Sequence, residues 1–235
     1  MKNNLYKFSW GELYVHNDDL ISTTLIKDKN WESYHDIVID KYIKKDSIVL
    51  DIGANIGIFT TKCANKCKYV YSFEPYIKNY ELLVKNICIN NLKNVIPHFF
   101  AISDDINITK INWITPNNFG AVGLDISKDK DTDYCKYISS ITDTNNRIDI
   151  MTTNLDNLNL NKVDFIKIDT EGCEFLCIKG AINTLKKYKP IMLIEHNTNE
   201  QKKVMLDYLH NNNLMYTQKH IEKHDYLYII DYDSK

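Results

Sequence analysis

The sequence predicts a doubly wound α/β fold with one mostly parallel sheet of seven strands, in a single domain of residues 1–235. From Ser47 onward, apolar runs alternate with amphipathic segments, which is the rhythm of βαβ units. A chain of 235 residues is long enough to bury the core of one such domain. No internal repeat and no Pro-, Gly- or Ser-rich linker divides the chain.

The chain divides into a cap, residues 1–45, and a ligand-binding core, residues 46–235. The cap has a strand-like start and then a helix through Trp31–Val38. The first elements of the core are expected to be a strand over Ile48–Ile52, a helix from about Gly57 to Cys67, a strand over Tyr69–Phe73, a helix over Tyr76–Asn90 and a third strand over Val95–Ala101.

After the third strand the pattern predicts a β insertion. Ile106–Ile114 alternates as a strand, and Ala121–Ile126 returns antiparallel after a turn. The remaining predicted elements are a strand near Ile148–Thr152, a strand over Val163–Asp169, a helix over Cys173–Lys187, a strand over Ile191–Glu195, a helix around Glu200–His210, and strands near Leu214–Lys219 and Tyr226–Ile230.

The charge and the amino terminus limit the partners of the chain. A net charge of −2 gives no overall field that draws the chain to nucleic acid, so a nucleic-acid partner is not expected. The first residues lack the apolar core of a signal peptide, and no apolar run reaches the roughly 18 residues of a membrane span. We therefore expect a cytoplasmic protein whose six cysteines are reduced.

Asp51, Gly53, Asn55 and Gly57 follow the first strand, at the edge of the sheet where open α/β folds bind ligands. The glycines allow a sharp turn and a close approach of the ligand. The N–H groups of the next helix suit a ligand carboxylate, and Asp51 suits an ammonium group. Asn55 replaces the middle glycine of the dinucleotide fingerprint, which counts against NAD. Alone, the stretch also fits a generic strand–turn–helix.

Acidic and polar residues at the next two strand ends point to a nucleoside. Glu74 ends the second strand, where a carboxylate can accept hydrogen bonds from both ribose hydroxyls. Ser103 and Asp104 end the third strand and are expected to meet an adenine ring. The structural alternatives are a surface Glu before a proline turn and a solvated Ser–Asp turn.

Together these motifs resemble the FkbM family of methyltransferases over about residues 30–200. The resemblance rests on Val49–Thr60, Tyr71–Pro75, Phe100–Asp104 and above all Val163–Gly172, with its Lys-Ile-Asp-x-Glu-Gly block. It implies a Rossmann-like class I methyltransferase fold and S-adenosyl-L-methionine as methyl donor. It also implies O-methylation, commonly of sugar or polyketide hydroxyls, so the expected partner is a glycan or small-molecule substrate.

The fourth strand end carries the predicted catalytic residues, Lys167, Asp169 and Glu171. A sugar hydroxyl becomes a useful nucleophile as its proton leaves, and a carboxylate within hydrogen-bond reach can take that proton. Asp169 is the first choice for this role and Glu171 the second. A helix-start capping pair is the structural alternative for these two acids. Lys167, in a buried strand, either forms a structural salt bridge or neutralises the developing alkoxide.

The sequence says less about metal binding and about the residues that contact the methyl acceptor. Asp169, Glu171, Glu195 and His196 end adjacent strands and are of types that bind magnesium or manganese, but no spacing specifies a site, so no metal is predicted. The segment Asn118–Gly123 can border the substrate entrance. The aromatic side chains that can stack on a sugar, or belong to the core, are Trp31, Tyr34, Trp113 and Phe119.

Two other functions stay open. One is methylation of RNA or protein, although the chain lacks the Asn/Asp-Pro-Pro-Tyr type of motif found in base-amino methyltransferases. The other is a methyltransferase-like module that binds its ligand without catalysis. Such a module would be expected to lose the strand-end acids, and this chain keeps Asp51, Glu74, Asp169 and Glu171.

Overall fold

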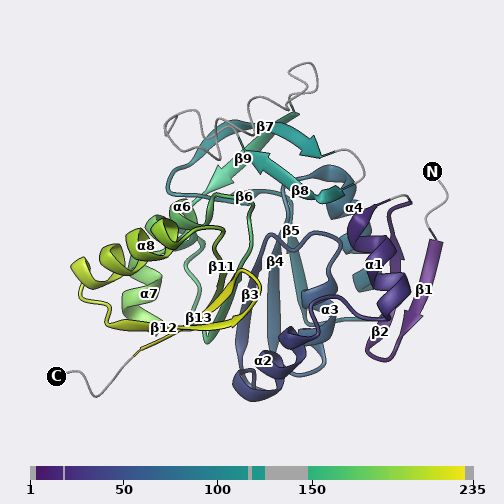
Figure 1. Cartoon of the computed structure of the whole chain (residues 1–235), viewed down its shortest axis with the longest axis horizontal. Coiled ribbons are helices and arrows are strands. Elements are labelled where there is room, and N and C mark those ends of the chain that lie inside the picture. Colours follow the sequence, from purple (N-terminus) through teal and green to yellow (C-terminus); the bar gives the residue numbers. More distant parts are fainter. Residues whose placement is uncertain (1–3, 18, 116–117, 125–147, 231–235) are drawn as a thin grey trace.

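The computed structural model describes residues 4–17, 19–115, 118–124 and 148–230. Its main sheet has seven strands in the order β12-β13-β11-β10-β3-β4-β5 (Figure 1). The strands are β3 (Ile48–Ile52), β4 (Tyr69–Phe73), β5 (Val95–His98), β10 (Phe165–Ile168), β11 (Ile191–Glu195), β12 (Tyr216–Glu222) and β13 (Asp225–Ile230). β13 pairs antiparallel with both β11 and β12, and the other neighbouring strands pair parallel, which confirms the predicted mostly parallel sheet with a closing strand pair.

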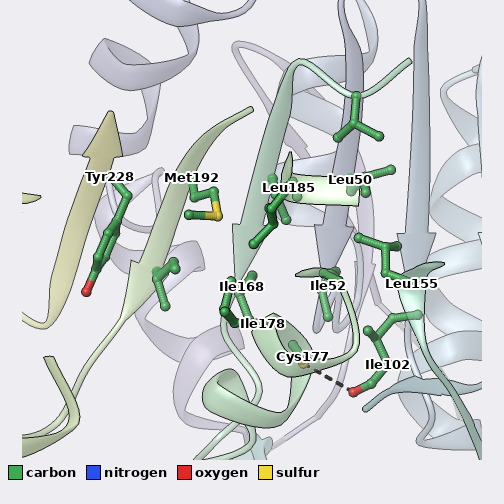
Figure 2. Close-up of a cluster of buried hydrophobic side chains, with 14 of the residues drawn as sticks. Leu50, Ile52, Ile102, Leu155, Ile168, Cys177, Ile178, Leu185, Met192 and Tyr228 are labelled. Carbon is green, nitrogen blue, oxygen red and sulfur yellow. Dashed lines mark hydrogen bonds between the residues drawn. The ribbon is translucent and has the colours of Figure 1, made fainter. Parts of the chain in front are cut away.

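Helices cover both faces of this sheet, because successive strand residues point to opposite sides. One face packs against α2 (Tyr34–Tyr42), α3 (Ile58–Ala64) and α4 (Ile77–Ile89). The other packs against α6 (Glu174–Lys179), α7 (Ile182–Tyr188) and α8 (Asn199–Asn211). Figure 2 shows this second core, where Leu50, Ile168 and Met192 of the sheet meet Ile178 and Leu185 of the helices. No helix of the described ranges has both the length and the apolar character to cross a membrane.

Two predicted elements were wrong in their extent. The third strand splits, because β5 ends at His98 and the next pair, β6 (Ala101–Ile102), leaves the main sheet to pair with β9. The predicted helix Cys173–Lys187 is two helices, α6 and α7, broken at Gly180. A Cβ at Gly180 would overlap the carbonyl oxygen of Ser103, so this close packing requires glycine.

The cap and the insertion meet above the strand ends. The cap has a hairpin that the sequence did not predict, β1 (Asn4–Phe8) with β2 (Gly11–Val15), and an unpredicted helix, α1 (Leu20–Asp28). The insertion forms a four-stranded sheet in the order β6-β9-β7-β8 across one end of the main sheet (Figure 1). Its longer strands are β7 (Asn107–Thr115), β8 (Asn118–Leu124) and β9 (Ile148–Thr153), and η1 (Leu155–Leu158) follows them.

Asp19 joins the cap to the insertion. Its side chain caps α1 by accepting from the backbone N–H of Ser22 at 2.9 Å, and it also accepts from the backbone N–H of Phe119 in β8 at 2.8 Å. Because Asp19 is buried, both hydrogen bonds are shielded from water. Cap and insertion are therefore fixed relative to each other.

Candidate active site

A cavity opens at the carboxyl ends of β3, β4 and β10, where an open α/β sheet binds its ligands. Six of the predicted site residues line it: Gly53, Asn55, Glu74, Lys167, Asp169 and Glu171. The other predicted residues, Asp51, Gly57, Ser103 and Asp104, are not among the lining residues. The cap and β8 complete the wall, so the cavity lies between the strand ends and these two added parts.

The loop between β3 and α3 has an unusual backbone. Gly53, Asn55 and Gly57 have φ angles of 79°, 51° and 89°, in the left-handed region. A Cβ on Gly53 would overlap the carbonyl oxygen of Asp169, so the loops that follow β3 and β10 touch at a point where only glycine fits. Gly57 precedes the first residue of α3, and a Cβ there would lie 2.7 Å from Leu83 Cδ1.

Lys167 lies between two carboxylates. Its Nζ is 2.9 Å from Asp169 Oδ2 and 3.8 Å from Asp51 Oδ1, and it donates to the carbonyl oxygen of Gly53 at 3.1 Å. Burial lowers the pKa of Lys167, but the carboxylates of Asp169 and Asp51 outweigh burial, so its pKa lies above the usual value. Lys167 is therefore a buried cation, and the salt bridge considered from the sequence is present.

Asp51 supports Lys167 from behind the cavity wall. It is fully buried, and Lys167 is its register partner on the neighbouring strand. Its Oδ2 accepts a hydrogen bond from Thr60 Oγ1 at 2.6 Å, whereas Oδ1 has no hydrogen-bond partner among the described residues. Burial raises the pKa of Asp51, and Lys167 opposes that rise. The contact of Asp51 with a ligand ammonium stays a prediction.

Glu74 connects the end of β4 to the loop after β3. Its two carboxylate oxygens accept the backbone N–H groups of Asn55 at 2.8 Å and Tyr76 at 2.9 Å. Burial raises the pKa of Glu74 to about 7, although these two hydrogen bonds lower it. Each oxygen keeps a further lone pair, so the carboxylate can receive two more donors from the cavity.

Ser103 and Asp104 contact α6 rather than the cavity. Asp104 Oδ2 forms an ion pair with Lys179 Nζ at 2.7 Å, and Ser103 donates to Asp104 at 3.4 Å. The cavity wall beside Glu74 is formed instead by Phe73, Ala101 and Ile102. The predicted adenine contact of Ser103 and Asp104 stays untested, and the apolar residues just before them are nearer the cavity.

Acidic side chains concentrate around Asp169. Burial raises the pKa of Glu171 to about 8, and the nearby carboxylates of Asp169 and Glu174 add to this shift. Burial likewise raises the pKa of Glu195 to about 10, with further contributions from Asp169 and Glu171. Both residues line the cavity, and their raised pKa values favour the protonated form. Helix α6 begins without a side-chain cap, so the capping alternative for Asp169 and Glu171 is not what the structure has. Glu174 instead accepts from Thr170 and Gly172 in this loop.

The sequence did not identify a second charged group, which comes from the cap and the last strand. Glu32 and His35 line the cavity, and Asp225 lies behind His35. His35 Nε2 is 3.0 Å from Asp225 Oδ2, and His35 Nδ1 is 3.5 Å from Glu32 Oε2. No sequence signal links these residues, because His35 and Asp225 are 190 positions apart.

The four strand-end residues considered for a metal do not all face one point. His196 turns away from the cavity, and its Nε2 lies 2.8 Å from the hydroxyl of buried Tyr228. Burial lowers the pKa of His196 to about 4. Within the described ranges, the group of side chains close enough to share a metal ion is Glu32, His35 and Asp225.

Of the four aromatic residues considered for acceptor stacking, Trp31 lines the cavity. Tyr34 is buried and donates its hydroxyl to Asp225 at 2.7 Å. Phe119 packs its ring against His16, with the ring centroids 4.7 Å apart. The side chain of Trp113 lies outside the described part of the chain.

Comparison with known proteins gives the same fold. The family model described as "Methyltransferase FkbM domain" matches residues 51–228. No curated protein matches the chain. Among solved structures, the methyltransferase FkbM from Methylobacillus flagellatus KT has a TM-score of 0.51 at 18% identity, over 78% of this chain and 43% of that one. The chain therefore spans less than half the length of that protein.

Two further structures are similar over nearly the whole chain. Trm5b from Pyrococcus abyssi has a TM-score of 0.52 at 11% identity, over 97% of this chain and 55% of that one. A tRNA m1G37 methyltransferase from M. jannaschii has a TM-score of 0.49 at 12% identity, with the same coverage of 97% and 55%. At such low identity the likeness to the two structures above 0.5 shows the fold alone, which is the Rossmann-like fold of class I methyltransferases.

Proposed function

Because the chain belongs to the methyltransferase FkbM domain family, we propose that it transfers a methyl group from S-adenosyl-L-methionine to a hydroxyl group of a sugar, a glycan or another small hydroxylated metabolite. The observation that carries the proposal is the convergence of Glu74, Lys167 and Asp169 on one cavity at the strand ends. The carboxylate of Glu74 suits the nucleoside end of the donor, and the ion pair of Lys167 and Asp169 suits the reacting end.

The residues present fit the donor in chemical type. Glu74 has two free lone pairs for the two ribose hydroxyls, as described above. Phe73, Ala101 and Ile102 offer an apolar wall for a flat ring beside it. The left-handed loop from Gly53 to Gly57 brings backbone close to the cavity, as the methionine end requires.

For the transfer itself, the chain has to position an acceptor hydroxyl and manage its proton. When bound, S-adenosyl-L-methionine supplies a methyl carbon on a positively charged sulfur. Asp169 orients the acceptor, and Lys167, 2.9 Å away, holds its carboxylate in place. Glu171, whose raised pKa favours its protonated form, can donate to a neighbouring oxygen of the acceptor.

Several features favour a small acceptor over RNA or protein. The cap and β8 add walls to the cavity at the strand ends, and Trp31 in its wall has an indole ring of the kind on which a sugar can stack. The net charge of −2 gives no attraction for a phosphate backbone. RNA and protein are also tested in the acceptor experiment, because the fold alone is compatible with either as the methyl acceptor.

Calorimetry with S-adenosyl-L-methionine tests the donor site. Glu74→Ala is expected to weaken binding by about 1–3 kcal/mol, since it removes a charged hydrogen-bond acceptor from the cavity. Glu81→Ala, on the exposed side of α4, is the matched control and should bind as the wild type does. No binding by the wild type at high micromolar concentration, or wild-type affinity in Glu74→Ala, would contradict the donor assignment.

A methyl-transfer screen with labelled donor tests the acceptor class. The arms are nucleotide sugars, free glycans, small hydroxylated metabolites, transfer RNA and a protein extract. Label in a sugar or metabolite hydroxyl is the expected result. Label in RNA or protein alone would replace this proposal, and donor binding without transfer to any arm would favour a non-catalytic module.

A further inference from the structure

Glu32, His35 and Asp225 form a charged group that is separate from the predicted site residues at the strand ends. His35 also lies outside the segment that the family model matches. His35 is 4% exposed and belongs to α2, whereas Asp225 begins β13. The imidazole is held edge-on to the rings of Tyr34 and Phe59, at centroid distances of 4.7 and 5.4 Å. It is therefore held rigidly in the cavity wall.

Hydrogen bonding determines which nitrogen of the neutral His35 ring carries the proton. Burial raises the pKa of Asp225, but the hydrogen bonds from His35 and Tyr34 outweigh it, so its pKa lies below the usual value and it is ionised. A carboxylate can only accept, so His35 Nε2 carries the proton at 3.0 Å from Asp225 Oδ2. The lone pair of neutral His35 is therefore on Nδ1.

Nδ1 is the ring nitrogen that lies beside Glu32 rather than Asp225. Its neighbour Glu32 Oε2 is 3.5 Å away, beyond an ordinary hydrogen bond, and Glu32 also lines the cavity. Glu32 has a φ of 48°, a backbone conformation that costs free energy and that clusters at functional sites. If His35 gained a proton, its two N–H groups would face the carboxyl groups of Glu32 and Asp225.

Asp169 Oδ2 is already paired with Lys167 Nζ at 2.9 Å. We propose that His35 is a further catalytic residue: it accepts the proton of the acceptor hydroxyl, with Asp225 as the residue that positions it. This inference rests on the proposed function. As the oxygen–methyl bond forms, the methyl–sulfur bond breaks with its electron pair left on sulfur, and the hydroxyl proton moves to His35 Nδ1.

The charges around His35 favour this role over a metal ion. The groups that face His35 are Glu32 from the loop before α2, Asp225 and Tyr34. Lys167 and Asp51 at the strand ends act on this group of charges at longer range. Asp225 Oδ2 already accepts two hydrogen bonds, at 2.7 and 3.0 Å.

A measurement on the protein without ligands tests the geometry. With ¹⁵N-labelled histidine, two-bond ¹H–¹⁵N spectra report which ring nitrogen is protonated, and His35→Gln identifies the signal. We expect the Nε2–H form in the wild type at pH 8 and a mixture of both forms in Asp225→Asn. An Nδ1–H form, or an imidazolium that persists to pH 9, would overturn the proposal, because Nδ1 would then have no lone pair.

Kinetics with the acceptor found by the screen tests the chemistry. We expect His35→Gln to bind donor within about 2-fold of the wild type and to lose about 100-fold or more in kcat, as removal of a general base does. His220→Gln, at an exposed histidine of β12, is the control and should keep full activity. If His35→Gln fails to fold, His35→Ala with added imidazole replaces it, and rescue of turnover supports the proposal.

The outcomes separate this inference from the proposed function. If the wild type binds no donor or transfers no methyl group, the proposed function fails and the inference fails with it. If the wild type is active and His35→Gln has the same kcat and the same pH dependence of its rate as the wild type, the inference alone is overturned. Micromolar Mn²⁺ binding that requires His35, with activity abolished by a chelator, would assign the three side chains to a metal and also overturn it.

Discussion

Replacing Lys167 with Met, a side chain of similar length, leaves the carboxylates of Asp51 and Asp169 without their ammonium partner. Asp51 is completely buried, so its cost dominates, while Asp169 can be solvated because its side chain is 33% exposed. At 3.8 Å and an effective dielectric constant of about 20, unit charges attract by about 4 kcal/mol. Breaking a buried ion pair typically costs about 3–5 kcal/mol. We therefore expect Lys167→Met to lower the free energy of unfolding by about 3–5 kcal/mol.

Urea denaturation at pH 8 and pH 5 measures this loss. Without Lys167 the pKa of Asp51 is raised further by burial, so stability falls as pH rises, and the deficit is larger at pH 8. Lys179→Met is the matched control: its pair with Asp104 is 2.7 Å long but 38% and 31% exposed, so we expect a loss below about 1 kcal/mol. Asp51→Asn in the Lys167→Met background should recover stability. Equal losses in the two lysine variants, or no recovery, would refute the reasoning.

Three further predictions concern the strand-end loops. Asp169→Asn should keep donor affinity in calorimetry and lose most of its methyl transfer, whereas unchanged turnover would exclude Asp169 from the reaction. Gly53→Ala should lower the melting temperature and weaken donor binding, because the added Cβ would overlap the carbonyl oxygen of Asp169. A melting temperature equal to that of the wild type would show that the two loops separate freely. The pKa of Glu195 is raised to about 10, so its contribution to stability is full below about pH 4.5 and is lost as pH rises through about 10. Glu195→Gln should therefore flatten the decline of unfolding free energy between pH 6 and pH 9, and an unchanged slope would contradict this.

The main sheet was predictable because its signals are local. Buried parallel strands are continuous apolar runs, and the bounds of β3, β4 and β11 match the prediction. The hairpin of the cap was missed because distant amides hold it. Asn86 of α4 accepts from the backbone N–H of Tyr14 at 2.6 Å, and Asn90 accepts from that of Glu12 at 2.8 Å. Such contacts leave no periodic pattern in either segment.

The candidate site also combines residues that the sequence predicted with residues that it did not. Gly53, Glu74 and Asp169 were predicted from strand ends, because parallel strands bring their carboxyl ends to one edge of the sheet. Ser103 and Asp104 were assigned to a strand that in fact splits after His98, and the split turns them toward α6. Glu32, His35 and Asp225 come from opposite ends of the chain, and only the folded structure brings them together.

The contact between His35 and Asp225 also bears on how the chain folds during synthesis. The cap leaves the ribosome about 190 residues before its partner strand, and chains fold from the amino terminus onward. A nascent chain can therefore pack α2, α3 and α4 against the first strands while one wall of its cavity is still missing. Strand β13 pairs with β11 through four register positions, so its arrival completes the sheet and brings in Asp225, which holds His35 of the cavity wall. The cavity is thus finished late, and its affinity for ligand should mark the complete chain rather than its folding intermediates.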